Sequence, residues 1–221
     1  FEGVPVNTIV GSILVTITSF PAKLSEGGIN DFYSNGDYWW PNPKKLNGLP
    51  YIKKDGETNP ENFGQHRLAL KALRDGVAAL AAAYKLTGDE RYVTKATELL
   101  KVFFLDAQTR MNPNLQYAQA IPGVSPGRGI GIIDALHLIE IPLAVKTLEN
   151  SKSFPKESGA ELRLWFGKLA NWMVDSKNGK EEAAAKNNHA VAFYLQLAVY
   201  ADFVNDAEKL KECRRQYKEI F

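Results

Sequence analysis

The sequence predicts an all-α fold built from antiparallel helical hairpins. Apolar residues recur at helical spacing in six segments between residues 59 and 220. Several of these segments follow one another after short turns, and no part of the chain alternates apolar and polar residues over several successive strands. Helices joined by short turns pack as antiparallel neighbours, so the pattern favours hairpins over any sheet-based fold.

The first hairpin is predicted over residues 59–106. Asn59 is expected to cap its first helix, with Pro60 at the first helical position, and the apolar pattern then continues to Gly88. The second helix follows at once over residues 89–106, which leaves room only for a tight turn.

A long loop and four further helices complete the helical part. The loop, residues 107–129, contains three prolines, and it is too long to be a simple connection, so we expect it to carry function. The helices are predicted at residues 130–149, 159–176, 186–204 and 206–220. Such pairs build either an open solenoid or a ring of inner and outer helices, and the lack of a repeat of fixed length weighs against the solenoid.

Residues 1–58 differ in character from the rest. They carry glycine, proline and asparagine throughout and lack sustained periodicity, so we expect an ordered, mostly irregular arm. The predicted division is therefore an N-terminal arm at 1–58 and a helical domain at 59–221. The chain begins with Phe1 rather than methionine, which suggests a processed or trimmed product whose secretion signal has been removed.

Composition excludes several classes of function. The 221 residues carry 27 Lys and Arg against 25 Asp and Glu, so there is no uniformly basic surface for nucleic acid. One cysteine and three scattered histidines suggest no metal site, and the apolar run at residues 9–17 is too short to span a membrane. Phosphate-binding, dinucleotide-binding and nucleophile-elbow motifs are missing, so no cofactor is expected.

The strongest candidate for chemistry is the stretch NNH, residues 187–189, at the predicted start of a helix. The positive end of a helix disfavours an imidazolium there, so His189 is expected to stay neutral and able to accept a proton. The Asn188 amide could stabilise negative charge growing on a carboxyl oxygen. Alternatively, an asparagine caps the helix and His189 is a packed side chain.

Two other segments could bind a sugar acid. The loop presents Gln116, Tyr117, Gln119 and Arg128, which offer hydrogen bonds and one cation, although they could equally cap and satisfy the loop itself. The arm contains the adjacent aromatics Tyr38, Trp39 and Trp40, which could stack on pyranose rings or anchor the arm. His66 and Arg67 remain open as further binding residues, and His137 is assigned to packing.

Six motifs, in order, resemble those of bacterial alginate lyases across residues 27–205. They read DFYSNGDYWWPNP, NPENFGQHR, LTGDERY, RMNPNLQYAQAIPG, GRGIGIID and NNH. The resemblance implies an incomplete (α/α) toroid, a periplasmic or secreted protein, and β-elimination on an acidic polysaccharide. The resemblance implies that the substrate is alginate rich in mannuronate, or a glucuronan-like polymer.

The resemblance also implies roles for individual residues. Asn188, with an arginine, would neutralise the uronate carboxylate, and His189 would remove the C5 proton or assist a tyrosine that does. The tyrosine would protonate the leaving O4, and both it and the catalytic arginine are expected beyond Phe221. The chain is therefore expected either to be a fragment of a longer protein or to differ in its catalysis. The residues expected to bind substrate come from the loop, the arm and the start of the first helix: Gln119, Arg128, Tyr38, Trp39, Trp40, Tyr117, His66 and Arg67.

Two other functions fit the same residues. The chain could hold acidic glycans without cleaving them, which saturable binding without product would indicate. It could also be a helical-repeat scaffold for a protein partner, since its LTGDERY hairpin is similar to tetratricopeptide-like pairs.

Overall fold

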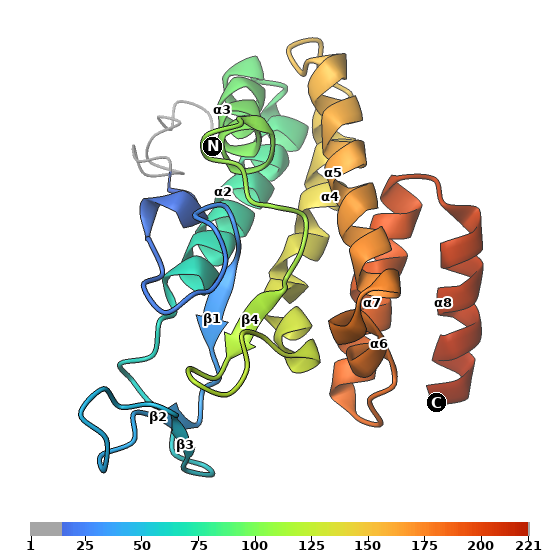
Figure 1. Cartoon of the computed structure of the whole chain (residues 1–221). Coiled ribbons are helices and arrows are strands. Elements are labelled where there is room, and N and C mark those ends of the chain that lie inside the picture. Colours follow the sequence, from blue (N-terminus) through green and yellow to red (C-terminus); the bar gives the residue numbers. More distant parts are fainter. Residues whose placement is uncertain (1–14, 221) are drawn as a thin grey trace.

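A computed structural model describes residues 15–220, so residues 1–14 of the predicted arm and Phe221 lie outside the described part. The prediction of an all-α chain of hairpins is confirmed (Figure 1). The helices are α2 (Gln65–Thr87), α3 (Glu90–Leu100), α4 (Glu140–Leu148), α5 (Lys156–Asp175), α6 (Lys177–Ala183), α7 (Asn188–Phe203) and α8 (Ala207–Ile220). None of the described helices is both long and apolar enough to cross a membrane.

The first hairpin turns where the sequence places glycine. Gly88 ends α2 in the left-handed region with φ 69°, and its N–H donates to the carbonyl of Tyr84. Asp89 then caps α3 by accepting from the Arg91 N–H at 2.9 Å. Helix α3 runs directly into one π-helical turn, Lys101–Leu105.

Two predicted boundaries need correction. Helix α2 begins at Gln65 with Gly64 as its cap, and not at Asn59. The side chain of Asn59 instead accepts from the Glu61 N–H at 3.0 Å and donates to the Trp39 carbonyl at 3.1 Å, so it closes a turn against the arm. The expected helix at 130–149 is a 3₁₀ helix, η3 (Gly129–Ile139), followed by α4.

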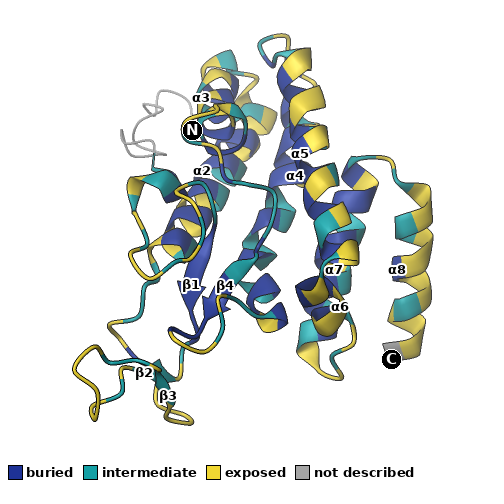
Figure 2. Ribbon diagram, in the orientation of Figure 1, coloured by how far each residue is buried: buried dark blue, intermediate teal, exposed yellow. Residues whose placement is uncertain are grey.

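The arm contains short strands that the sequence pattern did not reveal. Strand β1 (Tyr33–Asn35) pairs in parallel with β4 (Tyr117–Ala120), and β2 (Trp39–Trp40) pairs antiparallel with β3 (Ile52–Lys53). A short 3₁₀ turn, η1 (Ile17–Ser19), precedes them. The β1–β4 pair joins the arm to the loop before η3, and both strands are largely buried (Figure 2).

The core lies between the helices and holds a cluster of aromatic rings. Phe104 and Trp165 lie with ring centroids 4.6 Å apart, and Phe166 contacts Tyr200 and Phe203 at 5.2 and 5.6 Å. Their tilted and edge-on arrangements are those that aromatic pairs prefer. This cluster packs α5 against the C-terminal half of α7.

His66 fastens the arm to α2. Its Nδ1 accepts from the Tyr33 N–H at 3.0 Å, its Nε2 lies 2.9 Å from the Phe20 carbonyl, and the residue is 2% exposed. Both ring nitrogens are therefore occupied, with the proton on Nε2. We assign His66 this structural role in place of the expected contact with substrate.

We predict that His66 makes stability depend on pH. Burial lowers the pKa of its imidazole below the ordinary 6.5, so the unfolded chain binds the proton more readily. The free energy of unfolding should therefore fall as the pH drops below about 6.5. Urea titrations at pH 7.5 and 5.5 should show a smaller difference for His66→Gln than for wild type. The variant should also be less stable at pH 7.5, by roughly 1–3 kcal/mol, because the Tyr33 N–H loses its acceptor. An unchanged pH difference would contradict the prediction.

Candidate active site

Asp134, in η3, is the centre of a polar cluster between the arm, α2 and the loop. Its side chain is 6% exposed. Its Oδ2 accepts from Ser34 Oγ at 2.6 Å and from Arg67 Nε at 2.8 Å, and its Oδ1 accepts from Gln119 Nε2 at 3.1 Å. Asp134 was not among the residues predicted from the sequence, although a lone carboxylate within the apolar stretch of η3 indicates a buried partner.

Two of the predicted binding residues, Arg67 and Arg128, differ in how their charge is balanced. Arg67 also donates from Nη1 to Asp37 Oδ1 at 2.6 Å. Burial disfavours the Arg67 cation, but Asp134 and Asp37 outweigh this effect and raise its pKa. Arg67 is therefore neutralised by two carboxylates and serves to hold the cluster together.

Arg128 has no carboxylate within 4 Å among residues 15–220. Its Nε donates to the Gln119 carbonyl at 2.8 Å and its Nη2 to Gln119 Oε1 at 3.3 Å. Burial lowers the pKa of its guanidinium, only partly offset by the more distant Asp134 and Asp37. Arg128 is therefore the cation of this cluster with capacity for an added carboxylate.

Gln119 holds this arrangement through its backbone. It has a left-handed φ of 48°, which is uncommon for a residue other than glycine, and it is 8% exposed. Its N–H donates to Ser34 Oγ at 2.8 Å while its carbonyl faces Arg128. Gln119 therefore positions Arg128 and Asp134, and its own amide is already hydrogen-bonded.

The aromatic residues of the arm divide into different roles. Trp39 and the Arg128 guanidinium both approach Gly36: a Cβ built there would lie 2.8 Å from Trp39 Cδ1 and 2.5 Å from Arg128 Nη2. Trp40 has contacts within the arm itself. Its Nε1 donates to the Glu57 carbonyl, and Lys54 Nζ lies 4.2 Å from its ring centroid.

Tyr38 and Tyr117 lie outside the hydrogen bonds of the Asp134 cluster. Tyr38 is 42% exposed and free to meet a ligand. The Tyr117 ring packs against Gly27 of the arm, where a built Cβ would lie 2.5 Å from its Cε2. Of the predicted aromatic platform, Trp39 thus lies next to Arg128.

The second part of the site is the start of α7. Asn187 caps this helix by accepting from the His189 N–H at 2.9 Å. Asn188 is exposed, and the His189 side chain is 23% exposed, so neither is enclosed by packed helices. Asn188 lines a surface hollow of about 930 Å³ between η3, α7 and residues 185–188.

Glu182, near the end of α6, is the partner of His189. Its Oε1 lies 2.6 Å from His189 Nδ1, and the Glu182 side chain is 1% exposed. Burial raises the pKa of this carboxyl, the hydrogen bond from His189 opposes that rise, and the charge of Asp134 adds to it. Glu182 was not predicted from the sequence, because it belongs to a run of Lys, Glu and Ala that is typical of a solvated helix face.

The two parts of the site meet where η3 contacts α6 and α7. A Cβ built on Gly129, next to Arg128, would lie 2.6 Å from the Asn178 carbonyl of α6 and 3.0 Å from Glu181 Cβ. β4, α6 and the start of α7 all lie in the lower half of Figure 1. Within residues 15–220 no group of three or more His, Cys, Asp or Glu could hold a metal ion.

Comparisons with known proteins find similarity to alginate lyases. A family model described as alginate lyase matches residues 16–221. The chain is also similar to a crystal structure of an alginate lyase from Bacteroides ovatus, with 37% sequence identity and a TM-score of 0.88. That match covers 97% of this chain and 57% of the solved one, so the chain spans less than two thirds of that enzyme's length. No curated protein matches.

We predict that Asp134→Asn destabilises the fold. The change places an amide N–H where the carboxylate accepts, and it leaves Arg67 with one carboxylate, at a cost of roughly 1.5–3 kcal/mol in the free energy of unfolding. Asp75→Asn is the matched control, because it removes a carboxylate that is paired with Arg74 and 66% exposed, and it should cost less than about 1 kcal/mol. Urea denaturation measures both, and equal losses would count against the role given to Asp134.

Proposed function

Because this chain belongs to the alginate lyase family, whose fold is the (α/α) toroid, we propose that its protein cleaves an acidic polysaccharide by β-elimination. The substrate proposed is alginate, or a related polymer of mannuronate or glucuronate. The observation that supports this most is the Glu182–His189 hydrogen bond at 2.6 Å, beside the exposed amide of Asn188. We also propose that the protein works in the periplasm or outside the cell.

The reaction first needs the uronate carboxylate to be stabilised. The C5 hydrogen is weakly acidic, and removing it places extra negative charge on the adjacent carboxyl group. Asn188 would donate a hydrogen bond to that group, and Arg128 offers a cation with no carboxylate within 4 Å in the described residues. Trp39, next to Arg128, would contact the apolar face of a sugar ring.

His189 would then take the proton through Nε2. With Nδ1–H donating to Glu182, the lone pair of the ring lies on Nε2, and the carboxylate stabilises the imidazolium that forms. The C5–H bond breaks, its electrons form the C4–C5 double bond, and the C4–O4 bond breaks. Glu182 acts as a positioning residue, because it touches His189 and not the sugar.

The leaving O4 must receive a proton from an acid. Tyr200 is fully buried, so it cannot reach a sugar. Burial also raises the pKa of its phenol far above the ordinary value. Tyr194 lies five residues after His189 in α7 and lines a different, apolar hollow with Cys213. We assign the acid to neither. By resemblance to the family, we propose that a tyrosine and a second arginine, both beyond Phe221 in the same protein, complete the site.

We predict that Asn188→Ala and His189→Ala remove most lyase activity. In the protein that carries this chain, the His189 change should lower kcat by about 10²–10⁴-fold and the Asn188 change by about 10²–10³-fold. Ultraviolet absorbance of the unsaturated uronate, with polymannuronate, polyguluronate and polyglucuronate as substrates, measures both. His137→Gln is the control, because this histidine faces Arg74 and Lys71 rather than the site.

Two outcomes would contradict the proposal. If both alanine variants keep wild-type activity, the assignment of the reacting groups is wrong. If wild type binds these polymers saturably without forming product, the protein is a glycan-binding module.

A further inference from the structure

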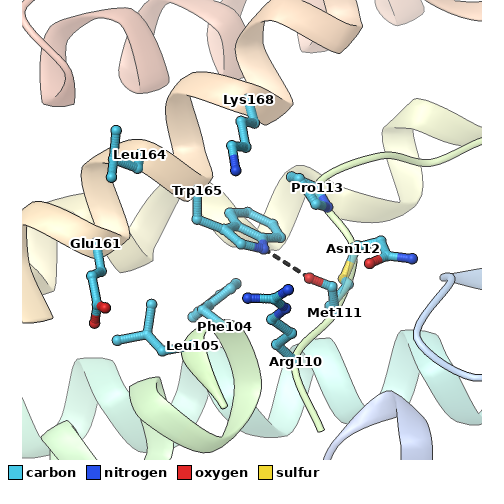
Figure 3. Close-up of a pocket in the computed structure, with 10 residues that line it drawn as sticks. All are labelled: Phe104, Leu105, Arg110, Met111, Asn112, Pro113, Glu161, Leu164, Trp165 and Lys168. Carbon is cyan, nitrogen blue, oxygen red and sulfur yellow. Dashed lines mark hydrogen bonds between the residues drawn. The ribbon is translucent and has the colours of Figure 1, made fainter. Parts of the chain in front are cut away.

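A second hollow, of about 390 Å³, lies between α5 and the start of the long loop (Figure 3). Its lining residues come from both walls: Phe104, Leu105, Arg110, Met111, Asn112, Pro113, Glu161, Leu164, Trp165 and Lys168. None of them belongs to the Asp134 cluster or to the start of α7. We propose that this hollow binds the carboxylate of an acidic sugar residue, as a remote anchoring site for the polysaccharide, an inference that rests on the proposed function.

The charges in the hollow are the first support for this inference. Arg110 and Lys168 lie on opposite sides of the Trp165 indole (Figure 3), and neither has an ion pair or a side-chain hydrogen bond within residues 15–220. Most arginines of the chain are held by carboxylates at 2.8 Å or less, as Arg67 is. Glu161, the one acid of the lining, lies within 4 Å of neither cation. Two unpaired cations facing one hollow favour an anionic ligand.

The walls are held in place without a ligand. Met111 is fully buried, its N–H donates to the Phe103 carbonyl at 2.8 Å, and its carbonyl accepts from Trp165 Nε1 at 2.8 Å. The Arg110 carbonyl accepts from Asn30 Nδ2 at 2.7 Å. The backbone that carries Arg110 is therefore fixed before binding, which lowers the entropy cost of capturing a ligand.

The remaining lining suits a sugar. Asn112 donates through Nδ2 to Asp31 Oδ1 at 2.7 Å, which directs its amide oxygen toward the hollow (Figure 3). That oxygen can accept from a sugar hydroxyl, while Phe104, Pro113 and Trp165 give an apolar floor. A small inorganic anion would use the two cations but neither of these features.

The position of the hollow explains why a polymer would use it. Arg110 begins the stretch of loop that ends at Gln119, which positions Arg128 in the candidate active site. The nine backbone steps from Arg110 to Gln119 span at most about 32 Å. A chain of several uronates could therefore reach both places at once, and the second contact would raise its effective affinity over that of a short fragment.

The test uses ¹⁵N-labelled protein in the His189→Ala background, which prevents turnover. Tetramannuronate is titrated in, with β-1,4-linked mannotetraose as its neutral match, and the indole N–H signal of Trp165 is followed by NMR. We expect tetramannuronate to shift this signal saturably and mannotetraose to leave it in place. Arg110→Gln and Lys168→Gln should each weaken the binding about tenfold or more, because each removes one charge-assisted contact.

Arg214→Gln is the matched control. Arg214 also has no ion pair in the described part of the chain, but it lies on α8 beside a different hollow. The Arg214→Gln variant should bind tetramannuronate with wild-type affinity, as measured by the shift of the Trp165 signal. Equal weakening by Arg214→Gln, equal binding of the neutral sugar, or a Trp165 signal that never moves would each overturn the inference.

Enzyme kinetics separate this inference from the proposed function. In the active protein, Arg110→Gln should raise KM for long polymannuronate and leave kcat, and the KM for the shortest cleavable oligomer, unchanged. An unchanged KM for the long polymer would contradict the anchoring role even if the lyase is active. Conversely, a protein that shifts Trp165 with tetramannuronate but forms no unsaturated product would retain the anchoring site and lose the proposed lyase function.

Discussion

The candidate active site depends on one hydrogen bond, between the buried carboxyl group of Glu182 and Nδ1 of His189 at 2.6 Å. It joins α6 to α7 and fixes the orientation of the imidazole where α7 begins. A carboxylate that is 1% exposed needs a donor, and His189 supplies it. In the function proposed above, the carboxylate would in return hold the proton on Nδ1 and leave Nε2 unprotonated.

A second buried carboxylate, Asp134, performs a similar task for the binding side of the site. By accepting from Ser34, Arg67 and Gln119, it joins β1, α2 and β4 to η3. Because Arg67 is thereby neutralised, Arg128 is left as the cation of this cluster that has no carboxylate within 4 Å in the described residues. The fold therefore separates a structural arginine from one that is available to a substrate.

Sequence periodicity was sufficient to predict six of the helical segments, and the NNH motif was sufficient to locate the start of α7. The short helix α6, Lys177–Ala183, was not predicted, and residues 129–139 form a 3₁₀ helix and not the expected start of an α-helix. Asn59 was misread as a helix cap because an asparagine before proline also forms turns, and its side chain bonds to the arm. The strands of two to four residues were too short to show alternation. Glu182 and Asp134 could not be identified as partners, since their burial arises from contacts between elements distant in sequence. His66 appeared available for binding until its two backbone partners, Tyr33 and Phe20, were known.

The most direct test of this account is the tautomer of His189, measured by long-range ¹H–¹⁵N NMR at neutral pH in wild type and in Glu182→Gln. The account predicts a neutral ring with the proton on Nδ1 and an unprotonated Nε2 in wild type, and a loss of that preference in Glu182→Gln. A ring that carries its proton on Nε2, or on both nitrogens, could not accept the C5 hydrogen through Nε2. That result would contradict the account.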